Sequence, residues 1–223
     1  MVLLLGLLLA AALAALPFAM PSTTPAGLAV YTAAALLVLD RLPIYHPHPR
    51  FGLGNGITLA RAAGAAGFAA LALEPQVLAE RDGWWAVAAV TALLALDGVD
   101  GWAARREGLA SAFGARFDME VDAFLVLALS AIAFSLGKAG PWVLAIGLMR
   151  YAFVLAGMLW PVLAAPLPRS RRRSGICVVE VAVLGLLLAP PVEPPFSTGL
   201  AALALALVAG SFATDLWWLV RHR

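Results

Sequence analysis

The sequence predicts an all-α protein, a bundle of about eight transmembrane helices, and two observations lead to that prediction. Apolar residues make up 63% of the chain and charged residues only 13%, which is typical of a bilayer protein. The apolar residues also gather in eight stretches, each able to span a bilayer alone or with its polar flank. One bundle of helices can contain all 223 residues.

In chain order, the stretches cover residues 2–20, 26–39, 57–73, 84–96, 118–136, 142–160, 175–188 and 198–220. The first lacks the basic flank of a secretory signal, so we expect a retained helix. The fourth must continue through Arg106 if it is to carry the two aspartates that follow it. Prolines punctuate the connections after the first stretch and before the last, where a helix has to stop: Pro17, Pro21, Pro25, Pro191, Pro194 and Pro195.

Basic residues predict the orientation of the bundle. Only Arg81 and Lys138 fall on one set of alternate connections. The other set is rich in arginine, and such connections remain cytoplasmic. We therefore expect a multi-pass protein of the cell (inner) membrane with both termini inside. The arginines of the rich set are Arg41, Arg50, Arg105, Arg106, Arg116, Arg169, Arg171, Arg172, Arg173, Arg221 and Arg223.

Four aspartates lie where apolar helices meet this arginine-rich side. Asp97 and Asp100 are three residues apart, and Asp118 and Asp122 are four apart, so each pair shares one face of a helix. The first pair belongs to the last turns of one helix and the second to the first turns of the next. The connection at 107–115 is short enough to keep the two helices adjacent. We therefore expect the four carboxylates at similar depth, where ionisable residues indicate a functional site.

Carboxylates that converge at low dielectric repel one another unless cations compensate them. Ligands that are all oxygen indicate a hard divalent ion, Mg²⁺ or Mn²⁺. The predicted metal ligands are Asp97, Asp100, Asp118 and Asp122. They could hold two ions about 3.5 to 4 Å apart, which would clamp a phosphoryl displacement, or a single ion.

Small and basic residues beside these aspartates suit a diphosphate. Gly101 lets a bulky ligand approach the helix backbone, and Ala104 is small. Arg105 offers a planar, permanently charged fork that matches phosphate oxygens. Gly114 could end or bend the connection, and Ser111 could donate a hydroxyl hydrogen bond nearby.

The whole pattern resembles the signature of the CDP-alcohol phosphatidyltransferase family. All its fixed positions are filled, at the family's spacing, by Asp97, Asp100, Gly101, Ala104, Arg105, Gly114, Asp118 and Asp122. Upstream, the segment from Asn55 to Thr58, followed by Arg61, looks like the segment that opens the family's first core helix and lines its nucleotide pocket. The resemblance implies a six-helix core at 51–223, preceded at 1–50 by two additional N-terminal helices and a cytoplasmic connection.

This resemblance implies a reaction and roles for residues. The phosphatidyl group of CDP-diacylglycerol would pass to a small alcohol with release of CMP. Asp97, Asp100 and Asp118 would hold the metal, and Asp122 would contact the metal and serve as the base. The CDP moiety would contact Gly54, Asn55, Thr58, Gly101, Arg105 and Ser111. Asn55 could also cap a helix that starts near Ile57.

Further charged residues are candidates for contact with the acceptor alcohol. Arg150 lies inside an apolar run and should face the bundle interior, where it either pairs with Glu180 or contacts the acceptor. Glu180 could itself be an acceptor ligand. Arg171, Arg172 and Arg173 form a topogenic or lipid head-group patch, or they clamp an acceptor that carries a phosphate.

Two other functions use the same residues. A soluble CDP-alcohol could donate to diacylglycerol, or the aspartates could form the site of a divalent-cation transporter or binding protein, which leaves Gly101, Ala104 and Arg105 unexplained. The net charge of +2 and the lack of interleaved aromatic and basic residues argue against nucleic acid as a partner. The single cysteine, Cys177, excludes an intrachain disulfide. The family resemblance also implies a homodimer.

Overall fold

The structure, a computed structural model, describes residues 51–80, 82–165, 167–168 and 170–221, with isolated positions between 25 and 50. These residues contain helices and no strand, which confirms the prediction of an all-helical protein. The α-helices are α3 (Gly52–Leu73), α4 (Gln76–Glu80), α5 (Trp84–Arg106), α6 (Ala112–Ser135), α7 (Leu144–Leu159), α8 (Arg171–Leu187) and α9 (Phe196–Arg221). Two 3₁₀ turns, Pro141–Val143 and Pro161–Ala164, precede and follow α7.

Among the described residues, four segments are long and apolar enough to cross a bilayer: α3, α5, α9 and Pro141–Leu159, which contains α7. They support a multi-pass membrane protein. Helices α6 and α8 are not among these candidate spans. Helix α6 contains three carboxylates within 118–122, and α8 has only 17 residues, three of them arginine. The count of eight spans is not confirmed, since residues 2–20 lie outside the described residues and only isolated positions of 26–39 are described.

Helices α3 and α6 begin at least five residues earlier than the sequence predicts, and in each a side chain satisfies a backbone N–H group of the first turn. In α6, the Ser111 Oγ accepts the Gly114 N–H at 3.0 Å, so the helix starts at Ala112 and the connection shortens to 107–111. In α3, the Glu107 Oε2 accepts the Leu53 N–H at 2.7 Å. The helix therefore starts at Gly52, and the prediction that Asn55 caps a helix starting near Ile57 is wrong.

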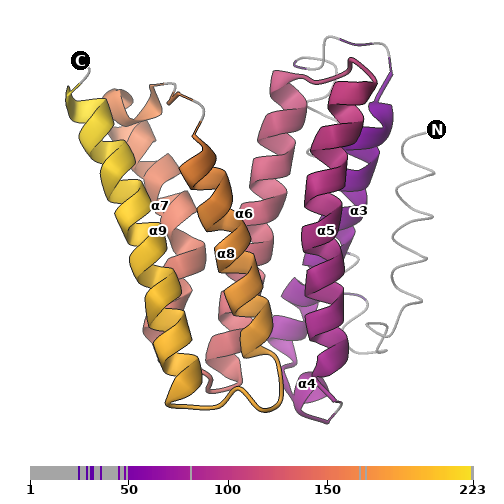
Figure 1. Cartoon of the computed structure of the whole chain (residues 1–223), viewed down its shortest axis with the longest axis vertical. Coiled ribbons are helices and arrows are strands. Elements are labelled where there is room, and N and C mark those ends of the chain that lie inside the picture. Colours follow the sequence, from indigo (N-terminus) through magenta and orange to yellow (C-terminus); the bar gives the residue numbers. More distant parts are fainter. Residues whose placement is uncertain are drawn as a thin grey trace.

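The helices form two groups that separate toward one end (Figure 1). One group contains α3, α5 and α6, and the other contains α7, α8 and α9. Helix α6 joins them, because it packs against α3 in its own group and against α7 and α8 in the other. Helix α8 also contacts α5. The fully buried side chains lie in both groups: Phe68, Leu71, Leu129, Ile132, Val143, Leu184 and Leu187.

Glycines allow the two groups to pack closely where they meet. A Cβ added at Gly147 of α7 would lie 2.4 Å from the Leu127 Cα of α6. A Cβ added at Gly185 of α8 would lie 2.6 Å from the Val90 Cγ1 of α5. No side chain larger than hydrogen fits at these distances, so the two glycines fix the spacing of the helices.

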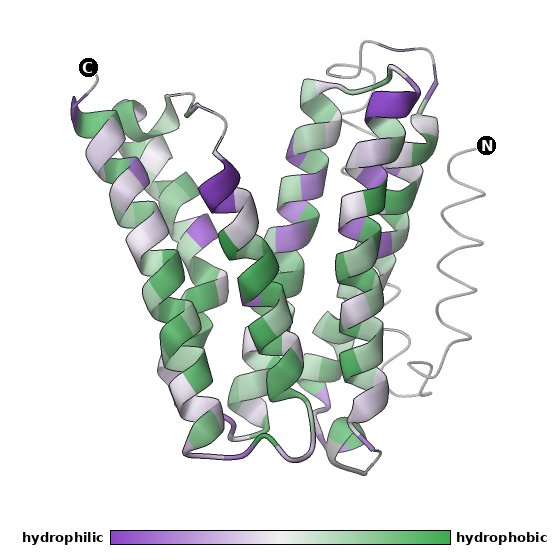
Figure 2. Cartoon of the chain, in the orientation of Figure 1, coloured by the Kyte–Doolittle hydropathy of each residue, from purple (hydrophilic) through white to green (hydrophobic). Residues whose placement is uncertain are grey.

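Polar residues are concentrated at the end where the groups separate (Figure 2). Helices α5 and α9 end there, and α6 and α8 begin there (Figure 1). The arginines at these helix ends therefore share one side of the bundle, as the sequence predicts: Arg105, Arg106, Arg116, Arg171, Arg172, Arg173 and Arg221. Lys138 lies at the opposite end, paired with Glu193 at 2.5 Å.

Candidate active site

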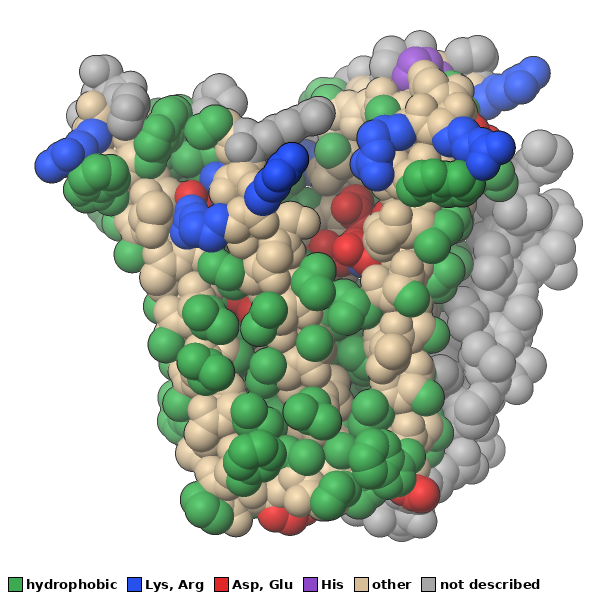
Figure 3. Space-filling model, viewed as in Figure 1, with side chains coloured by type: hydrophobic (Ala, Val, Ile, Leu, Met, Phe, Trp, Pro, Cys, Tyr) green, Lys and Arg blue, Asp and Glu red, His purple; other side chains and the backbone are tan. Residues whose placement is uncertain are grey.

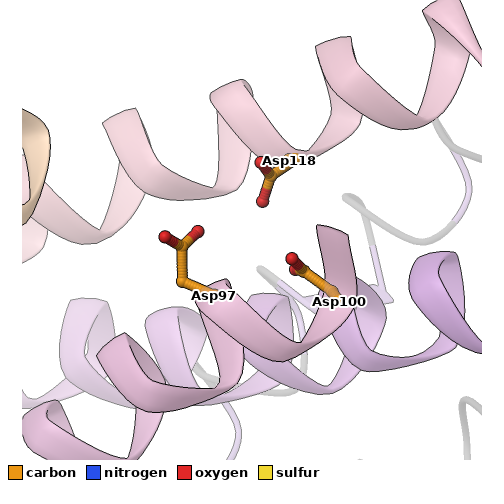
Figure 4. Close-up of side chains that lie close together, drawn as sticks. All are labelled: Asp97, Asp100 and Asp118. Carbon is orange, nitrogen blue, oxygen red and sulfur yellow. The ribbon is translucent and has the colours of Figure 1, made fainter. Parts of the chain in front are cut away.

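The structure brings the signature aspartates together between α5 and α6. Asp97, Asp100 and Asp118 point toward one another (Figure 4), and one oxygen atom of each lies within 4.8 Å of the others. Asp97 lies about two and a half turns from the end of α5, and Asp118 about two turns from the start of α6. The two helices therefore place their carboxylates at the same depth. Figure 3 shows acidic side chains in a hollow between the two helix groups, with basic side chains at its rim.

A buried arginine of α3 links all four aspartates. The Arg61 side chain is only 2% exposed. Its Nη1 lies 2.7 Å from Asp100 Oδ2 and 2.5 Å from Asp118 Oδ1. Its Nη2 lies 2.8 Å from Asp97 Oδ1 and also pairs with Asp122 Oδ1. The sequence pattern places Arg61 in the nucleotide segment and does not predict its contacts with the aspartates. A signal was present, because an arginine within an apolar span requires an anionic partner.

Asp100 is the most buried carboxylate of the cluster and has the most hydrogen bonds. Besides Arg61, its Oδ2 lies 3.0 Å from the Thr58 hydroxyl, and its Oδ1 accepts the Gly101 N–H at 2.6 Å. The Thr58 hydroxyl also lies 3.1 Å from the Gly54 carbonyl, and its one proton serves one acceptor at a time. Thr58 therefore contacts the carboxylate cluster directly.

Two of the predicted CDP contacts take part in packing between helices. A Cβ at Gly54 would lie 2.7 Å from the Ala104 Cβ, so these two small residues let α3 and α5 cross closely. The Asn55 Nδ2 donates to the Phe51 carbonyl at 2.6 Å. A Cβ at Gly114 would lie 2.8 Å from the Asn55 Oδ1, so this glycine of α6 accommodates the amide.

The remaining predicted CDP contacts lie at the ends of α5 and α6. Arg105 is exposed, and its Nη1 would lie 3.1 Å from a Cβ at Gly101. The absence of a side chain at Gly101 thus leaves space for the Arg105 guanidinium beside the acidic cluster. Ser111 caps α6 through its Oγ, a role that the sequence analysis did not assign to it.

Most of the predicted acceptor contacts form ion pairs of their own. Arg150 lies 2.6 Å from Glu120 of α6, so the alternative of a pair with Glu180 is wrong. Because α6 packs against α7, Glu120 of α6 is the carboxylate within reach of Arg150 of α7. Both Arg172 and Arg173 pair with Asp215 of α9, at 2.6 and 3.1 Å.

Arg171 is exposed at the first position of α8. Glu180, on the same helix, is 7% exposed, and its Oε1 has no hydrogen-bond partner among the residues that the structure describes. One turn earlier, the Cys177 thiol lies 3.7 Å from the Asp122 Oδ2. Cys177 and Glu180 share a face of α8, so this helix extends the site beyond Asp122.

The donor set fits a hard divalent cation. Four carboxylates face one guanidinium, and at least three oxygen atoms converge without nitrogen or sulfur ligands. The cluster already holds one cation, Arg61, and its excess negative charge can attract more. Because carboxylate oxygen is the ligand that Mg²⁺ and Mn²⁺ prefer, the residues present suit either ion.

Comparison with known proteins agrees with this geometry. The sequence profile of the CDP-alcohol phosphatidyltransferase family matches residues 51–217, which include α3 to α8 and most of α9. No curated protein and no solved structure matches the chain significantly. The match covers well over half of the chain and contains all four clustered aspartates. The chain therefore belongs to the CDP-alcohol phosphatidyltransferase family.

Proposed function

We propose that this protein transfers the phosphatidyl group of CDP-diacylglycerol to a small alcohol and releases CMP. Membership of the family supports a membrane-embedded transferase of phospholipid synthesis. The observation that carries the proposal is the convergence of Asp97, Asp100, Asp118 and Asp122, from two consecutive helices, in a hollow at the arginine-rich end. A site at that place can receive a lipid from the bilayer and a water-soluble acceptor.

The four aspartates would hold Mg²⁺ or Mn²⁺, as two ions or one. When bound, the metal neutralises the diphosphate and the charge that develops during displacement. The chain's own contribution is to fix the carboxylates. Asp100 is held by the Thr58 hydroxyl and the Gly101 N–H, and Arg61 keeps α5 and α6 together. Positioning of this kind accounts for most of the catalysis in phosphoryl transfer.

Asp122 would act as the general base. Its Oδ1 contacts Arg61, while its Oδ2 faces Cys177 of α8, toward the second helix group. An acceptor bound between α6 and α8 could therefore give its hydroxyl proton to Asp122. The acceptor oxygen then bonds to the phosphorus that carries diacylglycerol, and the bond between that phosphorus and the oxygen of CMP breaks. CMP leaves with that oxygen.

Different residues would bind the two substrates. The exposed guanidinium of Arg105 suits a phosphate of the CDP moiety, and the other proposed contacts of that moiety are Gly54, Asn55, Thr58, Gly101 and Ser111. On the acceptor side, the buried Oε1 of Glu180 can accept a hydrogen bond from a hydroxyl group of the alcohol. Arg171 is exposed, whereas Arg150, Arg172 and Arg173 would have to share existing ion pairs with the acceptor.

The reaction can be tested with the purified full chain in lipid vesicles. We expect CMP release from CDP-diacylglycerol with the correct member of a panel of alcohols, in the presence of Mg²⁺ or Mn²⁺ and not with EDTA. CMP release from a soluble CDP-alcohol and diacylglycerol instead would contradict the proposed donor. Transport of the metal without nucleotide turnover would contradict a transferase function.

The role of Asp122 leads to the first prediction. Asp122→Asn should lower the rate of CMP release by about 10²- to 10⁴-fold, because the amide cannot accept the acceptor proton. The matched control is Asp82→Asn, since Asp82 is exposed at the opposite end of α5. Unchanged activity of Asp122→Asn in folded protein would refute the assigned base.

We also propose that the N-terminal segment 1–50 and the core at 51–223 are separate units, and that the protein is a homodimer of the cell membrane with its site facing the cytoplasm. The arginine-rich end supports this orientation, because connections rich in arginine remain on the cytoplasmic side.

A further inference from the structure

We infer that Arg61 is an exchangeable internal cation, which competes with the divalent metal for the same carboxylates. In the absence of metal it holds the aspartates of α5 and α6 together. When metal binds, it gives up some of these contacts. The inference rests on the metal site of the proposed function and adds exchange with the metal to the role of Arg61 in holding α5 and α6 together.

Each terminal nitrogen of Arg61 bridges the two aspartate helices. The Nη1 contacts Asp100 of α5 and Asp118 of α6, and the Nη2 contacts Asp97 of α5 and Asp122 of α6. The guanidinium therefore lies among all four carboxylates and reduces their mutual repulsion. No other arginine or lysine forms an ion pair with these aspartates within the described part of the chain.

Arg61 is shielded from water, and one of its N–H donors has no hydrogen-bond acceptor among the described residues. It is 2% exposed, and α3 packs against both α5 and α6. Its Nε–H is buried without a hydrogen-bond acceptor among the described residues. Its two terminal nitrogens make all of its ion pairs with the aspartates.

Arg61 and a metal ion would bind the same carboxylates. A divalent ion such as Mg²⁺ binds carboxylate oxygen at about 2.0 to 2.1 Å, closer than the guanidinium nitrogens lie. At Asp100, both oxygens already have partners, since its Oδ2 contacts Arg61 and its Oδ1 accepts the Gly101 N–H. A divalent ion bound to these carboxylates and the Arg61 guanidinium would also repel each other, because both are positively charged. Arg61 remains charged after displacement, and the diphosphate of the donor is an anion that it could then contact.

The test compares Mn²⁺ binding to the purified full chain in lipid nanodiscs, measured by electron paramagnetic resonance, and thermal unfolding in EDTA. The variants are Arg61→Gln and Arg61→Lys. The matched control is Arg116→Gln, because Arg116 is exposed on α6 and lies outside the cluster. Neither readout depends on substrate turnover.

We expect Arg61→Gln to bind Mn²⁺ about ten-fold more tightly or better, because one cation–cation repulsion at a few Å is removed. In EDTA it should unfold at a lower temperature than the wild-type protein, because the carboxylates lose their counter-charge. Arg61→Lys keeps the charge but has no planar fork to bridge four carboxylates, so its Mn²⁺ affinity should lie between the two. Arg116→Gln should match the wild type in both measurements.

Equal or weaker Mn²⁺ binding by Arg61→Gln would overturn the exchange. If Arg61→Gln does not fold, equal or weaker binding by Arg61→Lys would do so. Failure of the wild-type protein and of every variant to bind Mn²⁺ would instead refute the metal site, and with it both proposals. Binding by the wild type that the Arg61 variants do not exceed leaves the metal site intact and refutes only the exchange.

Discussion

The hydroxyl of Thr58 is a small group with a large expected effect, because it supports the most buried carboxylate of the cluster. It lies 3.0 Å from Asp100 and one turn from Arg61, so α3 contributes two side chains to the same carboxylate. Hydrogen bonds from neighbouring groups orient metal ligands and tune their basicity. Thr58 therefore acts on the metal through Asp100.

Thr58→Val should weaken metal activation roughly ten-fold, because Asp100 loses one of the hydrogen bonds that orient it. The measurement is the Mg²⁺ concentration that gives half-maximal CMP release. Thr91→Val is the control, since the Thr91 hydroxyl donates to the Val87 carbonyl on an exposed part of α5. An equal Mg²⁺ requirement for both variants would mean that Thr58 only packs.

The convergence of the aspartates could be predicted at the residue scale, whereas their ion-pair partners could not. Spacings of three and four residues place side chains on one face of a helix, and a short connection keeps the two helices adjacent. Ion pairs such as Arg61 with Asp122 and Arg150 with Glu120 join different helices. Which residues pair depends on how each helix is rotated relative to its neighbour. The spacing of residues within one helix does not determine that rotation.

The end of α5 could be predicted from the aspartates that this helix carries, whereas the starts of α3 and α6 involve contacts of Glu107 and Ser111 that were not predicted. The extension of α5 through Arg106 is confirmed. The early start of α3 depends on Glu107, which is more than fifty residues away in sequence and close only in the folded chain. Ser111 is an N-cap that the local sequence could have revealed. Serine is among the preferred N-cap residues, because its side-chain oxygen accepts the backbone N–H two or three residues later.

Close packing between helices gives a prediction at the scale of the element. Gly147→Ala should destabilise the bundle by about 1 to 3 kcal/mol, because the new Cβ would lie 2.4 Å from the Leu127 Cα and α7 would have to move away from α6. In α9, Gly210 has nothing within 4 Å of an added Cβ. Gly210→Ala should therefore leave stability unchanged or raise it slightly.

Thermal unfolding of the two variants in the same detergent measures the difference. For a protein of this size, each kcal/mol corresponds to about 2 to 4 °C in Tm. Similar Tm values for Gly147→Ala and Gly210→Ala would show that α7 can shift without cost, and the proposed role of Gly147 would be wrong.

At the scale of the whole molecule, the two helix groups meet at one end and separate at the other, and this shape creates the site. Gly185 lets α8 approach α5 closely at Val90. Toward the arginine-rich end, Arg172 and Arg173 hold α8 against α9 through Asp215 rather than against the aspartate helices. The hollow of Figure 3 is therefore bordered by α8 on one side and by the carboxylates of α5 and α6 on the other.

The orientation of this hollow gives the last prediction. In a Cys177→Ser background, Ala110→Cys and Asp82→Cys place single exposed cysteines at opposite ends of α5. If arginine-rich connections remain inside, a membrane-impermeant maleimide should label Asp82→Cys in intact cells and Ala110→Cys only in inside-out vesicles. The Cys177→Ser protein without either substitution is the control for background labelling. Labelling of Ala110→Cys in intact cells would place the aspartate cluster on the outer face, away from cytoplasmic CDP-linked donors, and the proposed reaction could not proceed there.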